Sequence, residues 1–135
     1  MTRYIAACLL AVFLAGCNGG TVDRHALKRD AEKVGSLATE GGLLAHDVSS
    51  GASTSSFARV HAGELSRAAA DLQDALATRP TSPGIEADVR RLAKLAGKVS
   101  AALERIHRHP TDRGVAASLR PPLEADARAA DRLAK

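Results

Sequence analysis

Apolar residues recur at helical spacing along most of the chain, and no segment shows the strict alternation of apolar and polar residues that marks a half-buried β-strand. In the clearest segment, 83–108, two series of apolar residues repeat every seven positions: Ile85, Leu92, Val99 and Ile106, and beside them Val89, Ala96 and Leu103. Such a stripe lies on one face of an α-helix. The pattern predicts a helix over 83–108, with Ser82 as its N-cap and Pro83 at its first position.

Three further segments carry the same helical pattern. The segment 22–48 is predicted as one helix with a bend at the pair Gly41-Gly42, and the alternative is that this pair lets a neighbouring backbone approach. A second helix is expected over 56–78, after a loop of small polar residues. The last segment is expected as two short helices, 112–119 and 122–133, because proline opposes helical geometry in the residue before it. The break falls at Pro121-Pro122, with Arg120 as the joint.

The linkers between these helices are short, so neighbouring helices should run antiparallel. The pattern therefore predicts an all-α fold, a small antiparallel up-down four-helix bundle whose last helix is broken at the proline pair. Heptad spacing also fits an extended coiled coil, but the proline-bearing turns favour a monomer that folds back on itself. Phe57 is the one aromatic residue beyond the N-terminal run. The core should therefore consist of Leu, Val, Ile and Ala, with helices that approach closely.

The N-terminal segment differs from the rest of the chain. Arg3 precedes an uncharged run from Tyr4 to Ala15, which is shorter than the roughly 20 apolar residues that cross a bilayer. The run has the length of the apolar region of a secretory signal peptide. It ends in Leu14-Ala15-Gly16-Cys17, which resembles the lipobox of bacterial lipoproteins. The alternatives are an ordinary signal peptide in which Cys17 is incidental and a short anchor that is not cleaved.

The lipobox resemblance implies a cut between Gly16 and Cys17 and a diacylglyceryl group on the Cys17 thiol. The chain then divides into a signal peptide (1–16), a lipidated cysteine with a short tether (17–21) and a helical bundle domain (22–135). The covalent lipid on Cys17 is the one group that we expect beyond the polypeptide, and no cofactor is expected.

The same resemblance predicts a location in the cell envelope, with the membrane held through the lipid. In Gram-negative lipoproteins an Asp after the cysteine tends to retain the protein in the inner membrane, and here that position is Asn18. We therefore expect the outer membrane, facing the periplasm, in a Gram-negative host. In another host the expected place is the outer face of the plasma membrane.

Composition and motifs argue against catalysis and against nucleic-acid binding. The formal net charge is only +4 and aromatic residues are few, so the clustered positive charge and the stacking rings of nucleic-acid-binding proteins are missing. The sequence contains no H-E-x-x-H, no G-x-S-x-G and no phosphate-binding or dinucleotide-binding glycine motif. We expect a protein that is not an enzyme and whose partner is an envelope protein.

Four histidines should gather at the end of the bundle that lies farthest from the tether: His46, His61, His107 and His109. Imidazole is a common metal ligand, so this end is a candidate site for a metal or a small ligand. The heptad pattern places His46 and His107 on outward-facing positions and only His61 near the core. The spacing of His107 and His109 is not the i,i+4 pairing that binds a metal on one helix face, and solvated side chains are the simpler interpretation.

A row of basic residues follows one face of the helix 83–108: Arg91, Lys94, Lys98 and Arg105. This face lies nearly opposite the apolar stripe. It is typical of the solvated face of a helix, and it is also a candidate surface for anionic partners.

These observations lead to one main functional hypothesis and two alternatives. The main hypothesis is a membrane-anchored bacterial envelope lipoprotein with a non-catalytic binding or scaffolding role. The first alternative is an envelope sensor that binds a metal or a small ligand at the histidine-bearing end. The second is a binder of anionic cell-wall polymer or lipid headgroups that uses the basic row.

Overall fold

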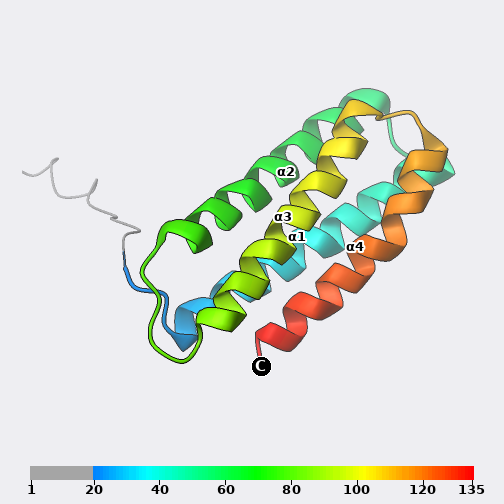
Figure 1. Cartoon of the computed structure of the whole chain (residues 1–135). Coiled ribbons are helices and arrows are strands. Elements are labelled where there is room, and N and C mark those ends of the chain that lie inside the picture. Colours follow the sequence, from blue (N-terminus) through cyan, green and yellow to red (C-terminus); the bar gives the residue numbers. More distant parts are fainter. Residues whose placement is uncertain (1–19) are drawn as a thin grey trace, which may run out of the picture.

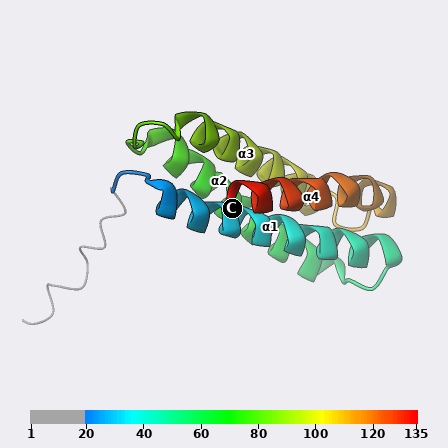
Figure 2. The ribbon, with the colours of Figure 1, turned by 90° about the horizontal axis from the view of Figure 1, so that it is seen from below.

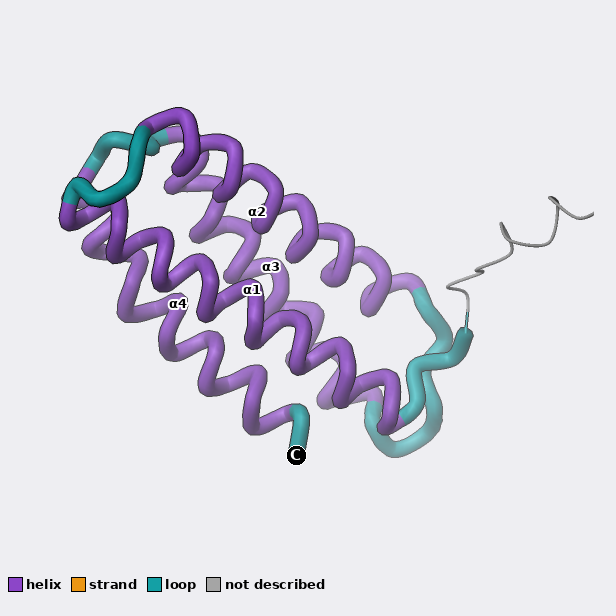
Figure 3. Tube along the Cα trace, turned by 180° about the vertical axis from the view of Figure 1, so that it is seen from behind, coloured by secondary structure: helices purple, strands orange, loops and turns teal. Residues whose placement is uncertain are grey.

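Four helices run back and forth through residues 20–135, the part of the chain that the computed structural model describes (Figure 1). They are α1 (Arg24–Ser50), α2 (Ser55–Thr78), α3 (Glu86–Arg108) and α4 (Arg113–Leu133). The α1–α2 and α3–α4 connections lie at one end, and the α2–α3 connection lies at the other end with the C-terminus (Figure 3). The prediction of an all-α up-down four-helix bundle is confirmed. The signal peptide predicted over 1–16, including Gly16, and the lipidation site Cys17 lie outside the described residues.

Local signals set most of the helix ends. Asp23, Thr54 and Asp112 each accept a hydrogen bond from the backbone N–H three residues further on, and so cap α1, α2 and α4. The hydrogen bond from the Ala26 N–H is the main reason why the pKa of the Asp23 carboxyl is lowered. At the other end of α1, Gly51 takes a left-handed conformation with φ of 78° and donates its N–H to the last turn, as glycine does at many helix ends.

The start of α3 differs from the prediction. The helix begins at Glu86 rather than at Pro83, and its N-cap residue, Ile85, makes no side-chain capping hydrogen bond. Gly84 turns the chain with φ of 91° and donates its N–H to a carboxylate oxygen of Glu86 at 2.8 Å. The predicted cap at Ser82 is wrong because the helix begins four residues after Ser82, and Ser82 belongs instead to the loop that pairs with Val22, as described below.

The last helix is continuous, so the predicted break at Pro121-Pro122, with Arg120 as its joint, is wrong. Each proline removes one backbone donor, which leaves a carbonyl without a helical partner one turn earlier. Both prolines and the residues that carry these carbonyls are exposed, so water can satisfy the carbonyl oxygens. On the opposite face Leu119 and Leu123 are buried, and this packing holds the two halves of α4 in one helix.

The bundle consists of two close helix pairs, α1 with α4 and α2 with α3, and the contacts between the pairs are looser (Figures 1 and 2). Small residues make the close contacts possible. A Cβ atom on Gly35 of α1 would lie 3.8 Å from the carbonyl oxygen of Ala127 of α4. Between α2 and α3, the Ser66 hydroxyl donates to the Ser100 carbonyl at 3.1 Å, and the Ser100 hydroxyl returns a bond to the Ser66 carbonyl at 3.0 Å. The predicted close approach of the helices is confirmed.

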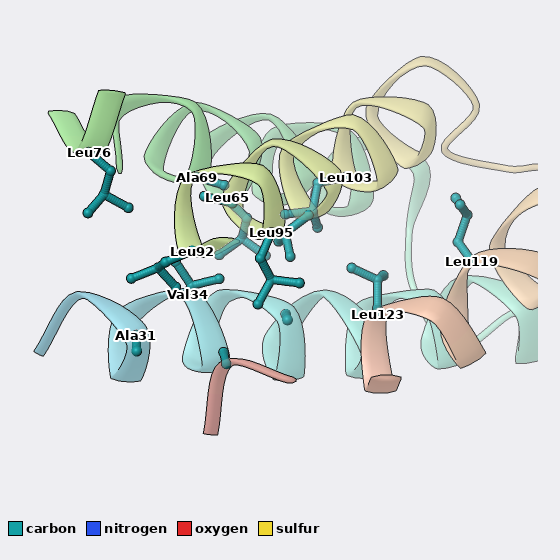
Figure 4. Close-up of a cluster of buried hydrophobic side chains, with 14 of the residues drawn as sticks. Ala31, Val34, Leu65, Ala69, Leu76, Leu92, Leu95, Leu103, Leu119 and Leu123 are labelled. Carbon is teal, nitrogen blue, oxygen red and sulfur yellow. The ribbon is translucent and has the colours of Figure 1, made fainter. Parts of the chain in front are cut away.

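Larger side chains fill the space between the two pairs (Figure 4). The buried hydrophobic residues of the described chain are all Ala, Val, Leu or Ile, as predicted. Gly41 lies in this layer, where a Cβ atom would come within 2.8 Å of Leu103. α1 runs unbroken through Gly41-Gly42, and Gly41 serves to let a leucine of α3 approach the α1 backbone.

Candidate functional sites at the two ends of the bundle

The segment that leads into α1 is fixed to the loop between α2 and α3. Val22 is fully buried, its N–H donates to the Pro80 carbonyl at 2.7 Å, and its carbonyl accepts the Ser82 N–H at 2.9 Å. These two bonds form an isolated parallel β-bridge between Val22 and Thr81. The residues next to the predicted tether are therefore part of the bundle.

Arg79, at the end of α2, holds this segment from the other side. Its Nε donates to the Gly20 carbonyl at 3.0 Å, and its Nη1 lies 3.3 Å from the Asp30 carboxylate. Asp30 is only 6% exposed, and a buried carboxylate needs such a partner. Two residues, Asn18 and Gly19, lie between Cys17 and Gly20, and a stretch of this length reaches at most about 10 Å. We call this end of the molecule the tether end.

A cavity of about 850 Å³ opens at the tether end between the start of α1, the first half of α3 and the end of α4. Five of its lining residues are basic: Arg24, Lys28, Arg91, Arg132 and Lys135. We call it the cationic cavity. Its one lining carboxylate, Asp88, pairs with Arg91 at 3.4 Å. No local sequence pattern predicts this site, because only Arg91 belongs to the basic row and the other residues come from helices that are distant in the sequence.

The predicted basic row on α3 is exposed along its whole length, but its four side chains do not converge on one site. Arg91, Lys94, Lys98 and Arg105 all lie at the surface, and the fourteen helical steps from Arg91 to Arg105 span about 21 Å. Lys98 lies close enough to Asp126 of α4 to favour its charged form, although burial has the larger effect and raises the pKa of that carboxyl. Of the four, only Arg91 lines the cationic cavity.

The histidine-bearing end is opposite the tether end, as predicted, but its imidazoles bind separate partners. His61 Nε2 lies 2.9 Å from a Glu40 carboxylate oxygen, and the His61 ring stacks on Phe57 at a centroid distance of 5.2 Å. His46 Nδ1 lies 2.9 Å from the guanidinium of Arg120.

The third histidine of this group, His107, departs from its predicted position. It lies in the α2–α3 contact, where its Nδ1 is 2.8 Å from the Arg59 carbonyl and its ring packs over Gly63. The outward orientation predicted for His107 is wrong, because Gly63 leaves room for the ring between the helices. His109 is the C-cap residue of α3 and contributes its backbone N–H. In the part of the chain that the structure describes, no three His, Cys, Asp or Glu side chains gather as a metal ion requires.

The large apolar side chains that are exposed also lie towards the end of the bundle opposite the tether end, which we call the far end. Phe57 and Val60 lie in the first two turns of α2, with 56% and 61% of their surface exposed. Leu43, in the second half of α1, is 63% exposed. Phe57 and Val60 are three residues apart and so are neighbours on the surface of α2, and adjacent exposed apolar side chains are a candidate contact surface.

Protein-family models, curated proteins and solved structures yield no match to this chain. Within residues 20–135, none of the helices combines the length and the apolar composition required to cross a bilayer. The function is therefore argued from the residues themselves.

Proposed function

We propose that the protein is a bacterial envelope lipoprotein that is tethered through Cys17 and has a non-catalytic binding or scaffolding role. The observation that carries this proposal is the sequence Leu14-Ala15-Gly16-Cys17 directly after an uncharged run of signal-peptide length. Acyl chains on one cysteine anchor a protein by burying CH₂ groups at about 0.8 kcal/mol each, and two or more chains make the attachment stable.

The geometry of the tether end is compatible with such an anchor. The hydrogen bonds at Gly20 and Val22 fix the chain to the bundle within the predicted tether and directly after it. A tether of about 10 Å at most would keep this end of the bundle beside the bilayer. The outer membrane, facing the periplasm, is the proposed place in a Gram-negative host because Asn18 follows Cys17.

The binding role is proposed for the far end, with an envelope protein as partner. Phe57 and Val60 are more than half exposed there, and aromatic residues are enriched where proteins contact one another. α2 extends about 36 Å from one end to the other, so these side chains would stand well clear of the membrane.

Metabolic labelling with a fatty acid tests the anchor. The wild-type protein should incorporate the label, and the Cys17→Ala variant should not. Cys8→Ala is the matched control, because it removes the other cysteine of the chain from within the predicted signal peptide and should leave labelling unchanged. Equal labelling of the Cys17→Ala variant would overturn the proposed lipidation site.

Photo-crosslinking in intact cells tests the binding role. A photoreactive residue at position 57 should give a defined adduct with one envelope protein, and Val60→Glu should abolish that adduct. The same photoreactive residue at Ala101, an exposed position in the middle of α3, is the control and should give no such adduct. Identical adducts from positions 57 and 101 would contradict a partner site at the far end.

A further inference from the structure

We propose that the cationic cavity at the tether end binds the phosphate of an anionic phospholipid headgroup. Basic side chains reach it from three helices: Arg24 and Lys28 are one turn apart at the start of α1, Arg91 comes from α3 and Arg132 from the end of α4. Guanidinium and ammonium groups that converge in this way form charge-assisted hydrogen bonds with phosphate oxygens.

The charges in the cavity are poorly balanced within the described chain. Arg91 pairs with Asp88 at 3.4 Å and Lys135 pairs with Asp131 at 3.2 Å. Among residues 20–135, no carboxylate forms an ion pair with Arg24, Lys28 or Arg132. Like charges that are gathered without counter-charges repel one another, and a bound anion relieves this repulsion.

The floor of the cavity distinguishes a lipid from a free anion. Leu27, Leu95, Leu133 and two alanines also line it. Leu27 and Leu95 are buried whereas the five basic residues are exposed, so the leucines form the floor and the charges the rim. A cavity with an apolar floor and a basic rim suits an amphiphile, whose phosphate meets the rim while its glycerol and first acyl carbons cover the leucines. A volume of about 850 Å³ is within the range of roughly 300–1,000 Å³ that small-ligand sites occupy.

The position of the cavity indicates where its ligand would come from. Its lining residues come from the start of α1, the first half of α3 and the end of α4, and Gly20 and Val22 lie directly before α1 in the chain. Figures 1 and 3 show the start of α1 and the end of α4 at the same end of the bundle. This part of the inference rests on the proposed anchor, which would keep the cavity next to lipid headgroups. The chemistry of the cavity is independent of the anchor.

A titration of the full chain in maltoside detergent, which contains no phosphate, tests the proposal. The probes are dihexanoyl phosphatidylglycerol, dihexanoyl phosphatidylcholine and inorganic phosphate, and calorimetry measures their affinities. We expect phosphatidylglycerol to bind most tightly. Its affinity should exceed that of inorganic phosphate by about tenfold or more, because the apolar floor contributes only to the lipid.

Two matched triple variants locate the binding. Arg24→Gln, Lys28→Gln and Arg132→Gln together remove three charges from the cavity, and the loss of charge-assisted contacts should weaken phosphatidylglycerol binding about tenfold or more. Lys94→Gln, Lys98→Gln and Arg105→Gln remove the same charge from outside the cavity, and screening should limit their effect to about twofold. Circular dichroism of each variant checks that the helices remain folded.

Three results would overturn the proposal: no phosphatidylglycerol binding, inorganic phosphate binding as tight as the lipid, or an equal loss in the two triple variants. The last result would indicate attraction to the overall charge rather than a site. Since this titration does not depend on acylation of Cys17, its outcome is separate from that of the labelling experiment.

Discussion

Gly41 and Gly42 are neighbours in α1 and both are buried, yet the same substitution should change the stability of the bundle differently at each. A Cβ atom on Gly41 would lie 2.8 Å from Leu103 Cδ2 and 3.5 Å from Leu123 Cδ1. A Cβ atom on Gly42 would meet Glu124 Cγ at 3.7 Å, which is an ordinary van der Waals contact. Gly41→Ala and Gly42→Ala therefore share one change in backbone freedom and differ in packing.

The magnitudes follow from these two effects. Alanine in place of glycine inside a helix favours the folded state by about 1 kcal/mol, and this gain applies to both variants. At Gly41 the new methyl group collides with Leu103, which is fully buried together with Leu123 and has no open space to move into. An extra methyl group in a packed core costs about 1–3 kcal/mol. Gly42→Ala should therefore gain about 1 kcal/mol, while Gly41→Ala should lie between no change and a loss of about 2 kcal/mol.

Thermal and urea unfolding followed by far-UV circular dichroism measure this difference, because the fold is helical throughout. For a domain of this size, 1 kcal/mol corresponds to about 4 °C in Tm. Gly42→Ala should melt about 4 °C above the wild type, and Gly41→Ala at least about 4 °C below Gly42→Ala. The backbone term cancels between the two variants, so their difference reports the packing around the two new methyl groups, which is tight only against Leu103.

A single result would refute this reasoning. If Gly41→Ala were as stable as Gly42→Ala, Leu103 would have to give way without loss, and the close approach of α3 to α1 would not explain why a glycine occupies position 41.

Three further predictions test other contacts. Arg79→Ala should lower the free energy of unfolding by about 2 kcal/mol, because it leaves the buried Asp30 carboxylate without its main partner. In urea unfolding, the double variant with Asp30→Ala should lose less stability than the sum of the two single losses. Strict additivity of these losses would argue against the pair. Ser66→Ala and Ser100→Ala should each cost about 1 kcal/mol because each removes one of two reciprocal hydrogen bonds, and a double-mutant cycle without coupling would contradict their joint role. Asp126→Asn should stabilise the protein at neutral pH. Burial raises the pKa of the Asp126 carboxyl, so the folded state binds the proton more tightly than the unfolded chain does. The wild-type protein therefore loses stability as the pH rises above the ordinary Asp pKa of 3.8. The advantage of Asp126→Asn in Tm should shrink as the pH falls towards that value, and a difference that stays constant with pH would rule out this origin.

The parts of the fold that the sequence predicted correctly are those in which a local pattern and the packing agree. The seven-residue repeats of α3 place Leu92 and Leu103 in the core, and both are fully buried. The four helices and their antiparallel order follow from such stripes and from short linkers. The error at Pro121-Pro122 has the opposite cause, since a local preference against helix was outweighed by the burial of Leu123 on the other face of α4.

The candidate sites were harder to predict because they depend on contacts between distant segments. The bridge from Val22 to the α2–α3 loop consists of two backbone hydrogen bonds, which no pattern of side chains predicts. It also places Ser82 in the bridged loop, and α3 begins only at Glu86, too far along the chain for Ser82 to cap it. His107 was assigned to the outside from its heptad position, but the absence of a side chain at Gly63 of α2 makes room for its ring.

The hydrogen bonds at Gly20 and Val22 bear on function more than on stability, because they determine how an anchored bundle could orient itself. A long flexible tether would let any face of the molecule reach the bilayer. With the chain fixed at Gly20 and Val22, the proposed anchor would hold the tether end against the headgroups and keep the far end about 36 Å away, the length of α2. The two ends differ accordingly in chemistry, since Arg24, Lys28 and Arg132 line a cavity at the tether end, while Phe57 and Val60 are exposed at the far end. Lipid phosphate and a protein partner could therefore bind at the same time, because neither would cover the surface that the other needs.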